Sequence, residues 1–505
     1  MGTLSSMLHI RRLLPWFGAC LGLAVAIGLL SGGRPVYAGD TPAPEGMGEP
    51  AMGDAAMGDA MGDDKGEPAD PDDEEDTSAA LAERVGKAIT KGVTWLKQHQ
   101  LSDGSWGLVE GNHAYGDKAQ GEPYKHPAGS TALALYTLLK CKEPMDDPVV
   151  KKGFKFLRDR FKIPGGSYET SMMLLAVTAT ADPFKKFSAT AQAGDKVKLT
   201  GEMRDWATKL RDSLLKKKQQ SKTLGWRYQI DNNNSTPGGN EDLSSTQLAA
   251  LSLLACERCG IKTESKVWND ILNFSMKQQE DDGPEWDRAV YDKTPKSKKK
   301  EGEAAPPPGG NDPDRGRYGP PAGAPAALKD KARGFSYIKS DKLSDDEGKA
   351  TGGMTACGVG NIQMVRYILG KRDEADWRNK DQKAILQAVY DGCAWLDMNW
   401  DPYQNPRKQR ENVYHIYYMY CVERAFDLIG NNLLGKRPWY QEMAEQLVGK
   451  QRDKGFWNSN TTHKPEEVLD TCFALLVLKR STRGGIPYGS ITQPGDEPPS
   501  DNRGK

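Results

Sequence analysis

The chain has no net charge, and beyond its N-terminus it has no long apolar run. Its 505 residues contain 69 Lys and Arg against 69 Asp and Glu. A polytopic membrane protein needs several spans of about 20 apolar residues, so that class is excluded. A chain disordered throughout is also excluded, because 37% of the residues are hydrophobic and 12 are tryptophan. These absences leave a protein with a globular body.

The neutral total is the sum of unequal segments. Residues 1–38 contain three arginines and no acid, which gives +3. Residues 39–78 contain fourteen acids and one base, Lys65, which gives −13. Because the total is zero, the remaining residues carry +10. Opposite charges therefore belong to different parts of the chain.

The first 38 residues have the order of a signal peptide. Arg11 and Arg12 precede an apolar run from 13 to 30, and Ala38 supplies a small residue for cleavage. We expect export to the periplasm, the cell envelope or the medium, with cleavage near Ala38. An uncleaved membrane anchor is the alternative, because the run is about long enough to cross a bilayer.

Three further segments lack the residues that build a core. Residues 39–78 repeat Met-Gly-Asp and end in acids, so we predict a disordered linker. Residues 292–333 are rich in Lys, Pro and Gly and predict a flexible basic insertion, and 483–505 predict a disordered tail. Because no aromatic residues alternate with a clustered basic face, a nucleic-acid partner is not expected. Association with a membrane or envelope surface stays open.

A repeated motif organises the body. Residues 91–106 read Lys-Gly-x-x-Trp-Leu-x-x-x-Gln-x-x-Asp-Gly-x-Trp, which predicts an amphipathic helix leading into a tight turn. The motif residues of this copy are Trp95, Gln100, Gly104 and Trp106. Degenerate copies supply Gln279 and Trp286, and then Gln451, Gly455 and Trp457.

Polar and apolar helices alternate along the body. We predict polar helices over 83–99, 148–161, 202–220, 265–279, 379–397 and 438–451. We predict apolar helices over 129–141, 169–180, 243–259, 351–369, 412–429 and 468–480. Such alternation fits two concentric rings, with the apolar set inside. The predicted fold is all-α: a single α/α toroid of six helix pairs, an (α/α)6 barrel over residues 79–482, behind a disordered N-terminal tether.

The motif at 91–106 resembles the QW motif of squalene and oxidosqualene cyclases. The helix pairing resembles the wider superfamily of terpenoid cyclases and protein prenyltransferases. In that superfamily the motif is structural, so the resemblance implies the toroid and not an activity.

The catalytic acid of the cyclases has only a partial counterpart. Where the family carries D-x-D-D-T-A at the start of an inner helix, this chain reads Asp-Leu-Ser-Ser-Thr-Gln from Asp242. A serine hydroxyl cannot protonate an alkene, so we expect Asp242, and likewise Asp470 at the start of the last apolar helix, to cap helices. If the chain is an enzyme of the cyclase-like isomerase or lyase type, Asp242 and Asp470 are the candidate acids.

A zinc site of the prenyltransferase type is not expected. Asp470-x-Cys472 has the spacing of two such ligands, but no histidine follows His463. We predict no cofactor and no metal. After loss of Cys20 seven cysteines remain, an odd number that cannot all be paired, and most lie on predicted helices beside apolar residues, where free cysteine serves as a small buried hydrophobe.

Aromatic residues crowd one predicted inner helix. Such rings stabilise apolar or cationic ligands, although they also fill protein cores. The candidate residues for a central ligand cavity are Tyr414, His415, Tyr417, Tyr418, Ser245 and Cys472.

Three classes of function stay open. The first, which we prefer, is an exported toroid that binds an apolar or isoprenoid-like ligand, a protein or a glycan in its centre or at its rim, without family catalysis. The second is an isoprenoid cyclase-like enzyme with altered acids. The third is a polysaccharide lyase or glycosidase, which also occurs on α/α toroids and needs two carboxylates facing each other across a cavity.

Overall fold

The computed structural model describes residues 71–107, 127–182, 199–221, 223–227, 241–290, 328–340, 348–407, 414–459 and 467–481. The predictions for residues 1–38 and 483–505 lie outside these ranges. The outer helices are α1 (Pro71–Gln98), α3 (Pro148–Arg160), α5 (Gly201–Ser221), α7 (Ser265–Lys277), α11 (Gln382–Met398) and α13 (Trp439–Lys450). The inner helices are α2 (Pro127–Lys140), α4 (Ser167–Ala179), α6 (Leu243–Arg258), α9 (Gly352–Arg372), α12 (His415–Ile429) and α14 (Glu467–Leu478).

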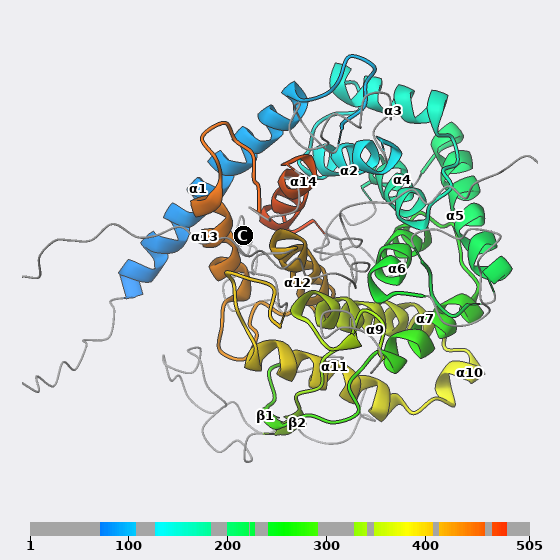
Figure 1. Cartoon of the computed structure of the whole chain (residues 1–505), viewed down its shortest axis with the longest axis vertical. Coiled ribbons are helices and arrows are strands. Elements are labelled where there is room, and N and C mark those ends of the chain that lie inside the picture. The colour runs from blue at the N-terminus through cyan, green and yellow to red at the C-terminus, as the bar shows by residue number, and fades with distance from the viewer. Residues whose placement is uncertain are drawn as a thin grey trace, which may run out of the picture.

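The inner helices form a closed ring. Each contacts the next along the chain, and the last, α14, contacts α2 (Figure 1). The predicted all-α toroid of six helix pairs is therefore confirmed. Short elements lie beside it: helix α10 (Ala375–Arg378) and strands β1 (Glu285–Asp287) and β2 (Lys329–Lys331), which pair antiparallel.

Burial separates the two sets of helices. Every residue of α12 is buried, and α6 is buried along nearly its whole length. The outer helix α7 buries only one side, with Trp268 and Ile271 facing inward, as its periodicity requires. Apolar helices covered on all sides can exist only inside a second layer, and this requirement sets the double ring.

The motif glutamines join successive repeats. The side-chain amide of each donates to a carbonyl of its own turn and to a carbonyl of the next outer helix. Gln100 Nε2 lies 3.0 Å from Gly104 O and 2.9 Å from Val149 O. Gln451 Nε2 lies 2.9 Å from both Gly455 O and Ala88 O. Since Ala88 belongs to the first helix, the second clamp closes the ring between the last repeat and the first.

The motif tryptophans anchor the same turns. The indole Nε1 of Trp106 donates to Leu96 O, and that of Trp457 donates to Leu447 O, each over 2.7 Å. Trp226 makes the equivalent bond to Leu214 O, over 3.0 Å. The backbone N–H groups of these three tryptophans donate to threonine hydroxyls in the first turn of the following inner helix: Thr131, Thr471 and Thr246. Each turn is thus fixed to the outer helix before it and the inner helix after it.

The turn glycines allow a close approach between repeats. Gly104 and Gly455 have φ of +96° and +101°, which favour glycine. A Cβ on Gly104 would lie 2.6 Å from Lys152 O, and one on Gly455 would lie 2.6 Å from Lys91 O. Trp95, from the same motif, stacks on Phe456 with centroids 5.3 Å apart and adds to the contact between first and last repeats.

The copy that starts at Gln279 differs from the sequence prediction. Gln279 Nε2 donates to Ala388 O of the next outer helix over 2.9 Å, but its turn contact is Arg333 O, over 3.2 Å. Phe335 occupies the aromatic position, and its N–H donates to Thr355 Oγ1 over 3.0 Å. Trp286 is instead 36% exposed on β1. The predicted insertion therefore lies inside this turn, and its end, predicted as flexible to residue 333, includes strand β2.

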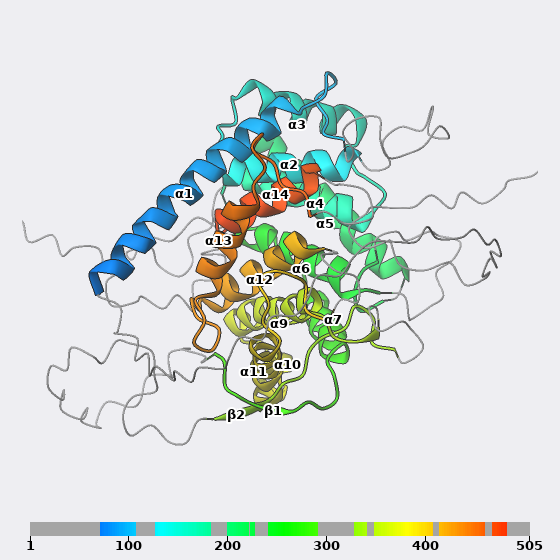
Figure 2. The ribbon, with the colours of Figure 1, turned by 60° about the vertical axis from the view of Figure 1, so that its left-hand side comes forward.

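Helix α1 begins earlier than expected. It starts at Pro71, inside the stretch predicted as linker, and its first half extends beyond the ring (Figure 2). Proline at the first helical position and acids in the first turn favour a helix start there. Among the described residues, none of the helices has the length and apolarity to cross a membrane.

The ring closure is testable with one pair of glycine substitutions. Gly455→Ala forces a Cβ against Lys91 O and a left-handed φ on alanine, so we expect a loss of about 1–3 kcal/mol in the free energy of unfolding. Gly449→Ala, in exposed space on the helix before the turn, should instead add up to about 1 kcal/mol. Urea denaturation followed by circular dichroism measures the free energy of unfolding of both variants. Equal changes in the two variants would contradict the close contact between Gly455 and Lys91.

Candidate functional site

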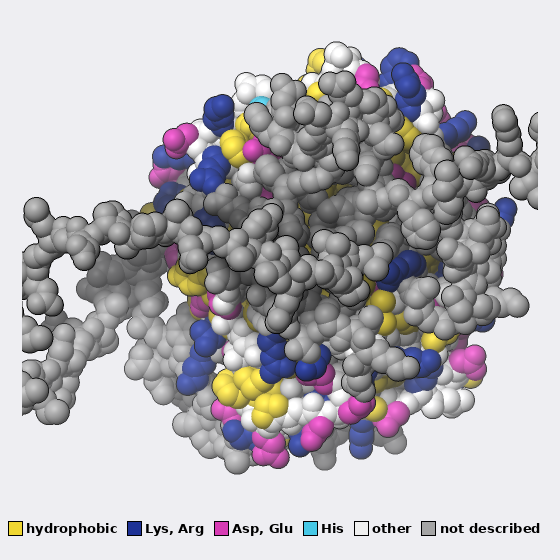
Figure 3. Space-filling model, in the orientation of Figure 1, with side chains coloured by type: hydrophobic (Ala, Val, Ile, Leu, Met, Phe, Trp, Pro, Cys, Tyr) yellow, Lys and Arg dark blue, Asp and Glu magenta, His cyan; other side chains and the backbone are white. Residues whose placement is uncertain are grey.

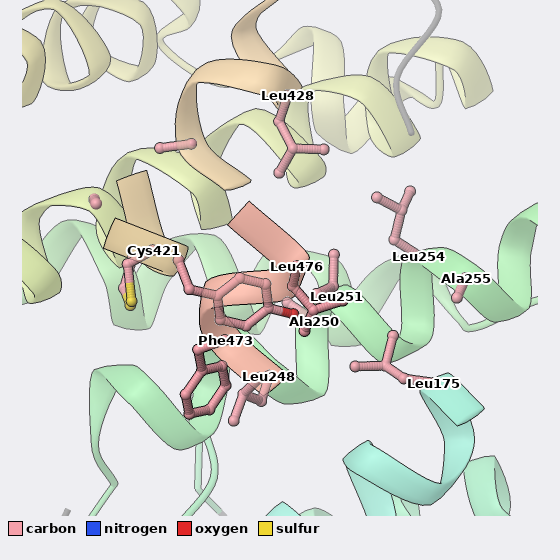
Figure 4. Close-up of a cluster of buried hydrophobic side chains, with 14 of the residues drawn as sticks. Leu175, Leu248, Ala250, Leu251, Leu254, Ala255, Cys421, Leu428, Phe473 and Leu476 are labelled. Atoms are coloured by element: carbon pink, nitrogen blue, oxygen red, sulfur yellow. The ribbon is translucent and has the colours of Figure 1, made fainter. Parts of the chain in front are cut away.

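The inner helices bring apolar side chains together at the middle of the ring. Figure 4 shows one cluster of buried hydrophobic side chains that includes Leu248 and Leu251 of α6, Phe473 and Leu476 of α14, Leu175 of α4 and Leu428 of α12. All six are buried. Any polar group among them has lost its hydration and must find a partner.

Arg424 is a fully buried guanidinium on α12. Its Nη2 lies 3.1 Å from Cys421 Sγ, and its Cζ lies 4.0 Å from the centre of the Tyr420 ring. It interacts electrostatically with Cys357 of α9 and Tyr136 of α2. Since α2 is not a neighbour of α12 in the ring, a guanidinium on α12 that interacts with Tyr136 of α2 faces the interior.

Within the described ranges, two nitrogens of this guanidinium have no hydrogen-bond partner. These are Nε and Nη1. On α6, the fully buried Gln247 likewise leaves both its amide nitrogen and its amide oxygen unpartnered. A buried donor without an acceptor costs about 1–3 kcal/mol, and more when it is charged. These two side chains therefore carry buried polar atoms that no described residue satisfies.

Gln247 lies close to the same helices as Arg424. A Cβ on Gly360 of α9 would lie 3.7 Å from Gln247 Nε2 and 3.9 Å from Leu428 Cδ1. The amide of α6 thus faces α9 and α12 beside the apolar cluster. Apolar surface and unsatisfied polar groups are thus both found among α6, α9 and α12 of the inner ring, and we call Arg424, Gln247, Tyr417, Cys357 and Cys421 the central polar group.

Asp242 is held by its own helix. It is the N-terminal cap of α6, and its carboxylate accepts from Ser245 N and Ser245 Oγ, each over 2.7 Å, and from Ser244 Oγ over 3.1 Å. Ser244 Oγ also contacts Tyr168 Oη of α4. Burial raises the pKa of Asp242, and the charge of Arg227 and these hydrogen bonds oppose the rise. The arrangement is that of a cap in a buried network.

Asp470 lies in the first turn of α14 and contacts a different segment. Its Oδ2 accepts from Ser459 N over 2.7 Å and from Ser459 Oγ over 2.8 Å. Desolvation raises its pKa to about 6 despite these bonds. None of the partners of Asp470 is shared with Asp242, and α6 is not a neighbour of α14 in the ring. The structure does not bring the two candidate acids together.

The candidate cavity residues are divided among several places. Tyr417 packs on Phe473, with ring centroids 5.4 Å apart, and interacts with Tyr168, Cys357 and Cys421. Tyr418 instead faces Gly352 at the start of α9.

The other members of that set also lie apart from Tyr417. His415 Nε2 is 2.9 Å from Pro402 O. Cys472 interacts with Thr137 and Cys141 of the first repeat, and the Ser245 hydroxyl donates a hydrogen bond to the Asp242 carboxylate. Tyr414 precedes α12 with φ of +59°. Only Tyr417 of this set belongs to the central polar group.

Two cysteines of the central polar group face each other. Cys357 Sγ of α9 and Cys421 Sγ of α12 are 3.5 Å apart, and both residues are fully buried. Burial raises the pKa of Cys421, but the hydrogen bond from Cys357 and the charge of Arg424 outweigh it and lower this pKa to about 7. The pKa of Cys357 rises through burial and the neighbouring sulfur.

Sequence reasoning missed Arg424 as a site residue and did not pair the cysteines. One signal was present: Arg424 and Glu423 interrupt a helix that is otherwise largely apolar from Ile416 to Ile429. The cysteine pair had no such signal, because 64 residues separate its members and their approach depends on α9 and α12 being neighbours.

Other site types have no support in the described ranges. No group of three or more His, Cys, Asp or Glu that could hold a metal occurs among the residues that the structure describes. On the face seen in Figure 3, basic and acidic side chains intermingle over the coloured residues, and no patch of one sign stands out.

Comparison with known proteins identifies part of the chain. Residues 77–181 match the family model of the squalene-hopene cyclase C-terminal domain, which confirms the resemblance to the squalene cyclase-like superfamily. A search of curated proteins found no match.

Two kinds of solved structure are similar over most of the chain. The type II terpene cyclase MstE from Scytonema, in complex with geranylgeranyl dihydroxybenzoate, has 10% identity and a TM-score of 0.41 over 80% of this chain and 99% of its own. An α-1,6-mannanase from Salegentibacter sp. has 11% identity and a TM-score of 0.42 over 79% of this chain and 98% of its own. Likeness at this level assigns no activity.

The buried histidine predicts a pH dependence. Burial and the charge of Lys450 lower the pKa of His415 from 6.5 to about 4, so the fold favours its neutral form. Its contribution to stability is therefore complete above the unfolded pKa and is lost as the pH falls from about 6.5 to about 4. Relative to His415→Asn, the wild type should lose about 3 kcal/mol over this range. Urea denaturation at several pH values measures the difference in the free energy of unfolding between the two proteins. A difference that does not change with pH would contradict the prediction.

Proposed function

We propose that this protein is an exported toroid that binds an apolar ligand bearing one anionic group in its centre, and that it lacks the catalysis of terpenoid cyclases. The observation that carries the proposal is the buried guanidinium of Arg424, whose Nε and Nη1 have no hydrogen-bond partner among the residues that the structure describes. A carboxylate or phosphate oxygen is the acceptor that such a fork suits best.

The surroundings of Arg424 suit the rest of such a ligand. Apart from Cys421, the residues of α4, α6, α12 and α14 that Figure 4 labels are aliphatic or aromatic. Tyr417 and Tyr420 pack on Phe473 with centroids 5.4 and 5.0 Å apart and present further aromatic surface. Apolar burial supplies most of the binding energy of hydrophobic ligands, and the one charged contact fixes their orientation.

The placement of Asp242 supports a role without catalysis. Its carboxylate accepts three hydrogen bonds from Ser244 and Ser245, as a helix cap does. The glycosidase alternative gains no support, because Asp242 and Asp470 have separate partners. Export is part of the proposal and follows from the signal-peptide pattern before residue 39, with the acidic linker as spacer.

One observation favours the cyclase-like alternative. Asp242 is fully buried at the start of an inner helix, burial raises its pKa, and Ser244 connects it to Tyr168. A raised pKa favours the protonated form of a carboxyl group, which is the form that an acid catalyst needs. Incubation with squalene and with geranylgeranyl compounds tests this alternative: a cyclised product that Asp242→Asn abolishes would replace the binding proposal.

Ligand binding is tested first on the native protein. The full mature chain is purified without denaturation and extracted with organic solvent, and we expect mass spectrometry to find an apolar acid in stoichiometric amount. A fluorescent long-chain carboxylate and an isoprenoid diphosphate, added separately, distinguish the two kinds of anionic head. We expect one of them to bind saturably.

Arg424→Met tests the charged contact. A hydrogen bond to a charged group contributes about 1.5–3 kcal/mol, so affinity should fall by roughly 10- to 100-fold. Arg378→Met is the matched control, because Arg378 is an exposed arginine paired with Asp373 on the outside of the ring. Circular dichroism checks that both variants fold. Equal affinity of Arg424→Met and wild type, or a wild type that neither carries nor binds such a ligand, would sink the proposal.

A further inference from the structure

Two sulfurs of the central polar group are in contact between neighbouring inner helices. Cys357 Sγ and Cys421 Sγ are 3.5 Å apart. A disulfide is about 2.05 Å long, so these are thiols in contact that need only a small movement to bond. They belong to α9 and α12, which are neighbours in the inner ring. A bond between them would join two helices that the chain otherwise connects only through α10, α11 and their loops.

The surroundings favour reaction at one of the two sulfurs. Arg424 Nη2 donates to Cys421 Sγ over 3.1 Å, and the charge of Arg424 stabilises a thiolate there. The hydrogen bond from Cys357 acts in the same direction, and together they outweigh burial in lowering the pKa of Cys421. Cys421 is therefore the nucleophile of the pair, and Cys357 is placed to resolve the product.

We propose that Cys357 and Cys421 are a redox-active pair that forms a reversible disulfide across the inner ring when hydrogen peroxide reaches it. The proposal is independent of ligand binding, because it rests on the contact between the two sulfurs and on Arg424 beside one of them. The oxidant is small and uncharged, which suits two fully buried residues.

The reaction balances in two steps. The thiolate of Cys421 attacks one oxygen of hydrogen peroxide, the O–O bond breaks, and the departing hydroxide takes a proton to become water, leaving a sulfenic acid. Cys357 then attacks the sulfur of that sulfenic acid, the S–O bond breaks, and hydroxide leaves with the proton of the Cys357 thiol as a second water. In total, two thiols and one peroxide give one disulfide and two waters.

The other described cysteines lack this arrangement. Cys256 and Cys259 lie three positions apart at the end of one helix, where disulfide geometry is poor. Burial raises the pKa of Cys256, and raises that of Cys259 to about 12. Burial also raises the pKa of Cys393 and of Cys472. Burial raises the pKa of Cys141 to about 12. For none of these five is a hydrogen bond from an arginine to the sulfur recorded in the described part of the chain.

Peptide mapping of the full chain tests the proposal directly. The native protein is treated with hydrogen peroxide, free thiols are alkylated, and the chain is digested without reductant. We expect a cross-linked peptide pair containing Cys357 and Cys421, lighter by two hydrogen atoms than the sum of its parts and lost after dithiothreitol. The oxidised protein should melt at a higher temperature than the reduced one, because the bond constrains the unfolded chain.

Single substitutions provide the matched controls. Cys357→Ala and Cys421→Ala should each abolish the cross-link and the rise in melting temperature, whereas Cys393→Ala, at another fully buried cysteine, should leave both unchanged. The peptide map of the wild-type protein tests the proposal even if a variant fails to fold. A cross-link between Cys256 and Cys259 as the main product, or no cross-link at any peroxide concentration that leaves the fold intact, would overturn the proposal.

Discussion

The closed ring depends on a hydrogen bond between its last repeat and its first repeat. Gln451 Nε2 donates to Ala88 O, across 363 residues of sequence, and Gly455 brings the same turn against Lys91 O. The same clamp, with Gln100 and Gly104, joins the first repeat to the second. In an open solenoid the terminal repeats need polar caps. Closure removes the ends, so the apolar faces of α2 and α14 cover each other and no inner helix meets water on that side.

Closure also determines what the centre can contain. Six helices that are apolar on all sides leave an interior in which every polar atom must find a partner. Asp242 finds its partners within its own helix, from Ser244 and Ser245. The Arg424 guanidinium contacts the Cys421 thiol and the face of the Tyr420 ring, and its Nε and Nη1 have no hydrogen-bond partner among the described residues. The contrast between a satisfied carboxylate and an unsatisfied guanidinium is why the proposed site centres on α12 rather than on the start of α6.

The repeat tolerates a long insertion because only a few contacts define it. Between Gln279 and Phe335 the chain leaves the turn and returns as an antiparallel pair, with Trp286 opposite Asp330. Phe335 then makes the bond to Thr355 that tryptophans make elsewhere. Asp330 in turn accepts from Arg288 and Gln387, which fixes the base of the insertion to α11. The entropy of closing such a loop grows only slowly with its length, so the cost to the ring is small.

The sequence by itself determined the helices and their order around the ring. The spacing of Trp95, Gln100, Gly104 and Trp106 predicts helix, turn and clamp together, because each of these residues acts on atoms within or next to its own repeat. The same local reasoning failed at Trp286, since a motif read by spacing cannot recognise a turn whose halves are far apart. It identified Asp242 as a cap because the partners of its carboxylate, Ser244 and Ser245, are only two and three residues away. Only the tertiary structure decided that Cys357 meets Cys421, that Arg424 faces inward and that Tyr418 does not. These facts depend on which inner helices are neighbours and how each is rotated, and both are set by packing between repeats distant in sequence.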